Sequence, residues 1–160
     1  MWRALYDFFV WCEATSAGQA IRDSVWLFPA IETLHLLALS VMGGMILAVD
    51  LRLLGLGLRR QPLPQLARDV EPWLAAALAV MLLSGFLLFL AEPLKCWDNG
   101  AFWVKMAFLF AALLFTFTVR RSYVRRDDPR IRPPFARTIA AVSLVLWTGV
   151  GVGGRGIGFY

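Results

Sequence analysis

The chain has 160 residues, of which 59% are hydrophobic, and its mean hydropathy is +0.65. These values exclude an ordinary soluble domain of this size and are typical of one compact membrane domain, residues 1–160. The formal net charge of +5 comes largely from arginine. The positions of those arginines favour a role in topology over the alternative, that the arginine-rich loop binds nucleic acid or a specific anionic lipid.

Residues 1–25 alternate bulky apolar residues with charged ones at a spacing typical of a helix. The segment is too short and too polar to span a bilayer, so we expect an amphipathic helix on the membrane surface. It lacks a basic region followed by an apolar run and a small-residue cleavage site. We therefore expect no cleaved signal peptide.

The first span is expected at about residues 30–58, with Pro29 in its first turn. A hydrocarbon core of about 30 Å needs about 20 apolar residues. Residues 31–54 supply them and include the only histidine, His35, together with Glu32. Ionisable groups inside a membrane are costly and usually functional, so the search for a site begins with these two residues.

Three more apolar runs predict spans at about residues 72–91, 101–119 and 134–153. The third contains Lys105 about one turn from its start. In the fourth, Gly149, Gly151 and Gly153 offer a small-residue face for close helix contact. The predicted fold is an all-α integral membrane four-helix bundle with an N-terminal interfacial helix.

Eleven of the sixteen basic residues lie around the loops after the first and third spans. In a four-span chain these two loops face the same side, and the positive-inside rule makes that side cytoplasmic. We therefore expect loops 59–71 and 120–137 in the cytoplasm and both termini outside. The residues are Arg52, Arg59, Arg60, Arg68, Arg120, Arg121, Arg125, Arg126, Arg130, Arg132 and Arg137.

This topology places Cys12 and Cys96 on the same non-cytoplasmic face, which is oxidising in a bacterial periplasm. A disulfide between them would fix the N-terminal helix over the bundle. Two unpaired thiols are the alternative, because the sequence does not give the Cα separation that a bridge requires.

Four ionisable residues are expected at one level of the bundle: Glu32, His35, Lys105 and Arg155. A buried carboxylate needs a cation, so Lys105 or Arg155 would pair with Glu32. One hypothesis is that His35 is an axial ligand of haem b, with Lys105, Arg155 or Lys95 near the propionates.

A single histidine does not provide two imidazole ligands from one chain. The second ligand would be a methionine, His35 of a second protomer, or absent. The candidate methionines are Met42, Met45, Met81 and Met106.

Other interpretations remain open. In one, the charged cluster is only a structural polar plug at the membrane interface. In another, Glu32 and His35 form a proton relay or a substrate site in a small carrier that works as an oligomer. E-x-x-H is also half of a carboxylate-bridged di-metal site. A cofactor-free accessory or scaffold subunit is a further alternative. The protein is expected to be an electron-transfer or accessory protein rather than a stand-alone enzyme, in a homo-oligomer or a membrane complex.

Asp50 lies about 28 Å along the helix from residue 31, at the opposite membrane boundary. There we expect it to pair with Arg120 or Arg121.

The chain resembles a family of small, uncharacterised bacterial inner-membrane proteins. The resemblance rests on IETLH at 31–35, DLRLLG at 50–55, KCWDN at 95–99 and GRGIGF at 154–159. It covers nearly the whole chain and implies a multi-pass protein of the bacterial inner membrane, with no assigned reaction. The first span is also similar to that of copper-resistance D proteins and cytochrome b561-like bundles, which bring several histidines to haem or metal. This chain departs from them in having only His35.

Overall fold

The computed structural model describes residues 2–56, 62–126 and 133–159. The regular elements in these ranges are helices. Four stretches are long and apolar enough to cross a membrane: Leu27–Leu54, Leu63–Ala91, Gly100–Arg125 and Pro134–Ile157. The chain is therefore a multi-pass integral membrane protein with an all-α fold, which confirms the predicted fold class.

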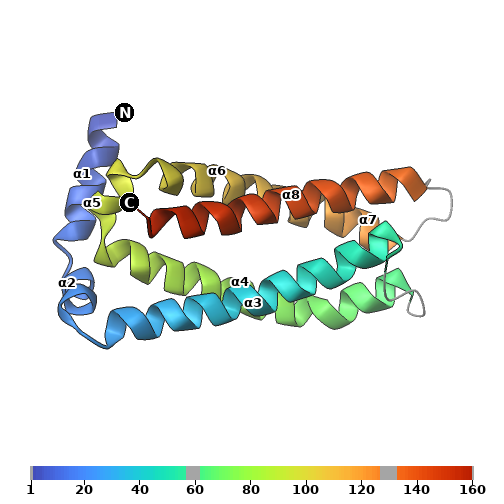
Figure 1. Ribbon diagram of the computed structural model, residues 1–160, viewed down its shortest axis with the longest axis horizontal. Helices are drawn as coiled ribbons and strands as arrows, with labels where there is room; N and C mark the ends of the chain where they lie inside the picture. Colours follow the sequence, from blue (N-terminus) through green and yellow to red (C-terminus); the bar gives the residue numbers. More distant parts are fainter. Residues whose placement is uncertain (1, 57–61, 127–132, 160) are drawn as a thin grey trace.

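Two pairs of helices make up the bundle. α3 (Leu27–Leu54) runs along α4 (Leu63–Ala91), and α6 (Gly100–Phe115) runs along α8 (Pro133–Ile157). The pairs are joined mainly by α3 against α8 (Figure 1). α6 continues through a π-helical segment, η1 (Thr116–Arg120), into α7 (Arg121–Arg126).

Three short helices gather at one end of the bundle: α1 (Trp2–Glu13), α2 (Ser16–Asp23) and α5 (Pro93–Asp98). Figure 1 shows α1 running across the ends of the spans. We call this the α1 end and the opposite one the α7 end. Arg22 fixes α2 to α4, because its guanidinium donates to the Ala91 carbonyl at 2.9 Å.

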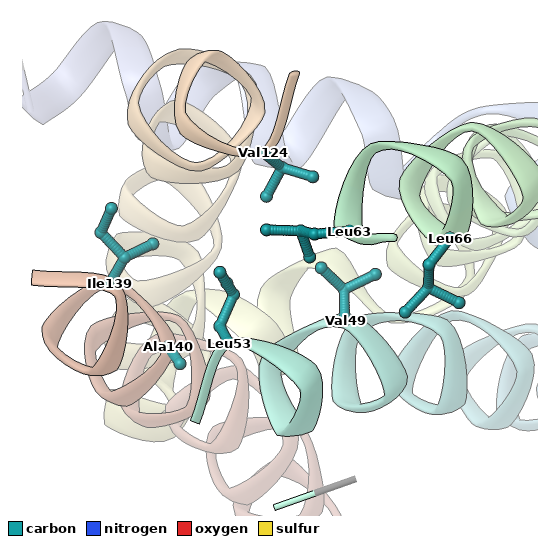
Figure 2. Close-up of a cluster of buried hydrophobic side chains, with 7 residues drawn as sticks. All are labelled: Val49, Leu53, Leu63, Leu66, Val124, Ile139 and Ala140. Carbon is teal, nitrogen blue, oxygen red and sulfur yellow. The ribbon is translucent and has the colours of Figure 1, made fainter. Parts of the chain in front are cut away.

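A buried apolar cluster holds the spans together toward the α7 end. Figure 2 shows its side chains meeting from α3, α4, α7 and α8. Lipid tails are as apolar as these residues, so the hydrophobic effect does not drive this packing. Van der Waals contact between closely packed side chains stabilises the cluster instead. The cluster consists of Val49, Leu53, Leu63, Leu66, Val124, Ile139 and Ala140.

The second span begins nine residues earlier than predicted, at Leu63 instead of Pro72. Pro64 and not Pro72 lies in the first turn, where a missing N–H is tolerated. Pro72 therefore lies inside α4 and removes one backbone hydrogen bond there. α8 likewise extends beyond the expected end at residue 153, to Ile157.

The expected single helix over residues 1–25 is two helices, because Thr15 caps the start of α2 by accepting from the Gly18 amide. α3 ends at Leu54 and not near residue 58, since Gly55 takes a left-handed conformation with φ 77°. Of the predicted arginine-rich loops, residues 59–61 and 127–132 lie outside the described part of the chain.

Candidate functional site

A cavity of about 480 Å³ lies inside the bundle in the half nearer the α1 end. All four spans contribute to its wall, including His35 from α3, Met81 from α4, Lys105 from α6 and Trp147 from α8. Most other wall residues are aromatic or aliphatic. Its size lies within the range of about 300–1,000 Å³ that is usual for small-molecule and cofactor sites.

His35 is held in one orientation by Ser84 of α4. The Ser84 hydroxyl donates to the Val80 carbonyl at 2.6 Å, so its oxygen accepts from His35 Nδ1 at 2.9 Å. In the neutral imidazole the proton then lies on Nδ1, and Nε2 keeps its lone pair. Among the described residues Nε2 has no hydrogen-bond partner. A free, oriented imidazole nitrogen is the arrangement that metal-ligating histidines require.

Gly85 lies directly beside the His35 ring. A Cβ at this position would lie 3.1 Å from His35 Cε1. That separation is tighter than ordinary van der Waals contact, so an alanine at this position would shift the ring by a few tenths of an ångström. Ser84 and Gly85 together therefore set both the hydrogen bond and the position of the imidazole.

Lys105 brings a cation to the same cavity from α6. Its backbone is approached closely by α8, because a Cβ at Gly153 would lie 3.1 Å from Lys105 Cα. Within the described ranges no carboxylate lies at ion-pair distance from its amine. The cavity is thus lined by the side chain of Lys105, which has no ion-pair partner among the described residues, and by one free imidazole nitrogen, in otherwise apolar surroundings.

One side of the cavity opens between α4 and α6, which meet through the stacked rings of Phe89 and Phe102, with centroids 5.9 Å apart. Leu82 and Phe86 of α4 and Met106 of α6 line this side and remain 46%, 55% and 41% exposed. We call this opening the α4–α6 mouth. Apolar residues exposed on a spanning helix face lipid, so the mouth connects the cavity to the membrane interior.

α1 covers the cavity on the aqueous side. Leu5, Phe8 and Phe9 of α1 line it. The Phe9 side chain is buried, and its ring centroid lies 5.0 Å from that of Phe89 and 5.1 Å from that of Trp97. These edge-to-face contacts fix α1 over the end of the bundle.

The structure brings together only part of the predicted cofactor site. His35, Lys105 and Met42 line the cavity, as do the methionines Met81 and Met106. Met45 is half-buried on α3 but is not part of the wall. Met42 is almost completely buried, with 1% of its surface exposed.

Glu32 and Arg155 lie outside the cavity, and both are exposed. Arg155 lies over the Phe159 ring, with its Cζ 5.4 Å from the ring centroid. Among the described residues the expected ion pair of Glu32 with Lys105 or Arg155 is not formed. The predicted group of four ionisable residues therefore reduces to His35 and Lys105.

The predicted di-metal alternative has no support in the described part of the chain, where no three residues of the types His, Cys, Asp and Glu come together. The sequence analysis also missed Ser84, Gly85 and Trp147, which help to form the site. One signal was available, since Ser84 and Gly85 interrupt an otherwise apolar run.

Cys12 and Cys96 are free thiols, so the predicted disulfide is not formed. Both are buried where α1 and α5 pack together. Burial raises the pKa of the Cys96 thiol to about 11, and the nearby Glu92 carboxylate adds to this rise. Burial also raises the pKa of Cys12. Both side chains are therefore present as neutral thiols at physiological pH.

Toward the α7 end, Asp50 pairs with Arg120, one of the two predicted partners. Arg120 Nε donates to Asp50 Oδ1 at 2.9 Å, and Arg120 Nη2 donates to the Ile46 carbonyl at 3.2 Å. Both side chains are buried. Arg120 ends the π-helical segment η1, and Thr116, which begins it, accepts a 3.2 Å hydrogen bond from Trp147 in the cavity wall.

A search of curated proteins and a search of solved structures gave no match. The family model described as a family of unknown function (DUF6644) matches residues 8–160. This confirms the expectation of an uncharacterised family. The chain belongs to family DUF6644, whose function is unknown.

Proposed function

We propose that this membrane protein binds haem b in the cavity, with His35 Nε2 as an axial ligand, and that it carries single electrons. The observation that supports this most directly is the oriented imidazole, whose Nδ1 proton is donated to Ser84 and whose Nε2 is free. Haem also requires a dry pocket between helices. The cavity of about 480 Å³, with its apolar wall, is suitable for it.

The residues around the cavity have separate roles in this proposal. Lys105 offsets the negative charge of a haem propionate, and α1 keeps water from the cavity. Met42, Met81 and Met106 line the cavity and are candidates for the second axial position. When bound, haem supplies one-electron redox chemistry, and the protein sets its potential through the axial ligands and the burial of the site.

We further propose that the α1 end faces the periplasm of a bacterial inner membrane. The described arginines of the α7 end include Arg68, Arg121, Arg125 and Arg137, and cytoplasmic loops carry the excess of basic residues.

A difference spectrum tests the proposal. The full chain, expressed with a haem precursor and purified in detergent, should show a reduced-minus-oxidised spectrum with a b-type α-band. His35→Ala should abolish the band, whereas Glu32→Ala, three residues away but outside the cavity, should keep it. Far-UV circular dichroism verifies that both variants are folded. A wild-type protein without the band, or a folded His35→Ala variant that retains it, would contradict the proposal.

A second candidate occupant is a membrane-dissolved quinone, which the α4–α6 mouth favours. Leu82, Phe86 and Met106 would surround its tail. His35 Nε2 would accept a hydrogen bond from a hydroquinone hydroxyl, and Lys105 would donate to a quinone carbonyl. Solvent extraction distinguishes the two candidates, since stoichiometric quinone in a preparation without an α-band supports the quinone.

A further inference from the structure

At the α7 end, two arginines of α7 converge on one carboxylate of α4. Arg121 Nη2 lies 2.5 Å from Glu71 Oε1, and Arg125 Nη2 lies 2.9 and 3.0 Å from the two Glu71 oxygens. Arg121 and Arg125 are one helical turn apart and therefore lie on the same face of α7. In the described part of the chain these two guanidinium groups share one carboxylate, so one positive charge of the three groups is not compensated there.

Both arginine side chains remain partly exposed. The side chains of Arg121 and Arg125 are 46% and 56% exposed. Each guanidinium has five N–H donors, and only one nitrogen of each is bonded to Glu71. The neighbouring Arg120 differs, because its guanidinium is buried and bonded to Asp50. Among the described residues Glu71 is the hydrogen-bond partner of both guanidinium groups, and their other donors are available to an external anion.

An apolar cleft of about 60 Å³ adjoins these charges. Val70 and Leu74 of α4, Phe117 of η1 and Val124 of α7 line it. The Phe117 side chain is 46% exposed. Val124 also belongs to the buried cluster of Figure 2, so the cleft has a packed floor. A rim of donors above an apolar surface matches a molecule with an anionic head and a hydrocarbon tail.

The position along the membrane normal restricts what that molecule is. Arg121 and Arg125 lie in the last turns of the span Gly100–Arg125. Spanning helices end near the level of the lipid phosphates. On α4, Trp73 follows Glu71 by two residues and is 63% exposed, as is usual for tryptophan at the membrane interface.

We propose that Arg121 and Arg125 bind the phosphate of an anionic phospholipid, with an acyl chain along the apolar side of α4 and η1. An anionic lipid is preferred because the group has one uncompensated positive charge, whereas a zwitterionic headgroup brings its own cation. Glu71 orients the two guanidinium groups and at the same time competes with the phosphate for them. This site is separate from the cavity and does not depend on haem.

The test compares phosphatidylglycerol with phosphatidylcholine of the same acyl chains, added to the full chain in detergent. Native mass spectrometry counts bound lipids, and the Tm reports stabilisation. We expect about a fivefold preference for phosphatidylglycerol, the effect of one charge near the surface. Arg121→Gln/Arg125→Gln should lose the preference. The matched control is Arg68→Gln/Arg137→Gln, which removes the same charge from exposed arginines outside the cleft and should keep it.

The variant Glu71→Gln distinguishes lipid binding by Arg121 and Arg125 from a purely structural role of these two arginines. It removes the competing carboxylate, so the preference for phosphatidylglycerol should increase even where the Tm without lipid falls. Equal binding of both lipids by the wild type, or loss of the preference in Glu71→Gln, would overturn the proposal. Glycerol phosphate without acyl chains should not raise the Tm. If it does so to the extent that the lipid does, the site binds a soluble phosphate and the proposal fails.

Discussion

His35 and Ser84 are 49 residues apart in sequence, yet the position of the imidazole proton depends on their contact. Ser84 donates its own proton to its helix backbone, which leaves its oxygen able only to accept from His35. A hydroxyl used in this way fixes the tautomer without adding a charge to the cavity. The free Nε2 is therefore a consequence of packing between α3 and α4.

Replacing Ser84 should weaken ligand binding without removing the ligand. Ser84→Ala removes the side-chain acceptor of Nδ1, so the ring turns more freely, and we expect haem affinity to fall about 10–100-fold. Haem titration of the detergent-purified apoprotein, followed by absorbance, measures this. Ser40→Ala is the control, because Ser40 also donates to a backbone carbonyl, that of Leu36, but lies outside the cavity. Equal losses in both variants would refute the role of Ser84.

The Cys96 thiol should react slowly and with a steep pH dependence. A pKa of about 11 leaves roughly one thiolate in a thousand at pH 8, and that fraction rises about tenfold per pH unit until the pKa is reached. Iodoacetamide labelling followed by peptide mass spectrometry reports Cys12 and Cys96 separately. Protein unfolded in detergent is the control and should label faster. Thiols that label only after reduction would instead indicate a Cys12–Cys96 disulfide.

The sequence located His35 and Lys105, but it did not indicate which of their neighbours share the cavity. Glu32 precedes His35 by three residues, so it lies about 60° away around the helix, and that rotation leaves it exposed. Arg155 follows Gly153 by two residues, about 200° around α8 and away from α6. Rotation about the helix axis is set by packing between helices, which a hydropathy pattern does not contain.

At the scale of the elements, α6 and α8 show how glycine permits close packing. No space remains for a side chain at Gly149, because a Cβ there would overlap the Phe108 ring. Gly151, only two residues further along, has no neighbouring atom within 4 Å of such a Cβ. Of the predicted small-residue face, Gly149 and Gly153 are therefore in contact with α6, and Gly151 is not.

This difference predicts opposite results for two similar substitutions. Gly149→Ala should lower the free energy of unfolding by about 1–3 kcal/mol through overpacking against Phe108. Gly151→Ala should be neutral or stabilise the helix by up to about 1 kcal/mol, since alanine favours helix more than glycine does. Denaturation by dodecyl sulfate in mixed micelles, followed by circular dichroism, measures both. Similar losses for the two variants would contradict the packing of α6 against α8.

The four spans themselves could be predicted because length and hydropathy determine them locally. The residues at which the spans begin and end could not be predicted in this way. Both Pro64 and Pro72 satisfy the first-turn preference of proline, and only the packing of Leu63 and Leu66 into the buried cluster explains the earlier start of α4. The π-helical segment η1 also left no sequence signal that we recognise.

For the molecule as a whole, the Asp50–Arg120 pair links the two helix pairs, from α3 to η1. The sequence indicated this pair because both residues lie at one membrane boundary. Ser143 of α8 also interacts with the buried Asp50 carboxylate, so the pair is part of a small polar group inside the bundle. Its contribution to stability depends strongly on whether either partner remains there alone.

Removing one partner should destabilise the fold far more than removing both. Asp50→Ala leaves Arg120 buried and unpaired, and we expect the free energy of unfolding to fall by about 3–5 kcal/mol. Asp50→Ala/Arg120→Leu should recover a large part of this loss. Glu71→Ala, which breaks the two exposed ion pairs with Arg121 and Arg125, should cost at most about 1 kcal/mol for each pair. The same micelle titration tests all three, and a double variant that is no more stable than Asp50→Ala would contradict the expectation.

The lateral position of the α4–α6 mouth has a consequence for how affinity is measured. A molecule that leaves the cavity on that side dissolves in the acyl chains, while α1 separates it from water. Occupancy then follows the mole fraction of the molecule in the lipid phase. A dissociation constant expressed per litre of solution will change with the amount of lipid or detergent, whereas one expressed per mole of lipid will stay constant.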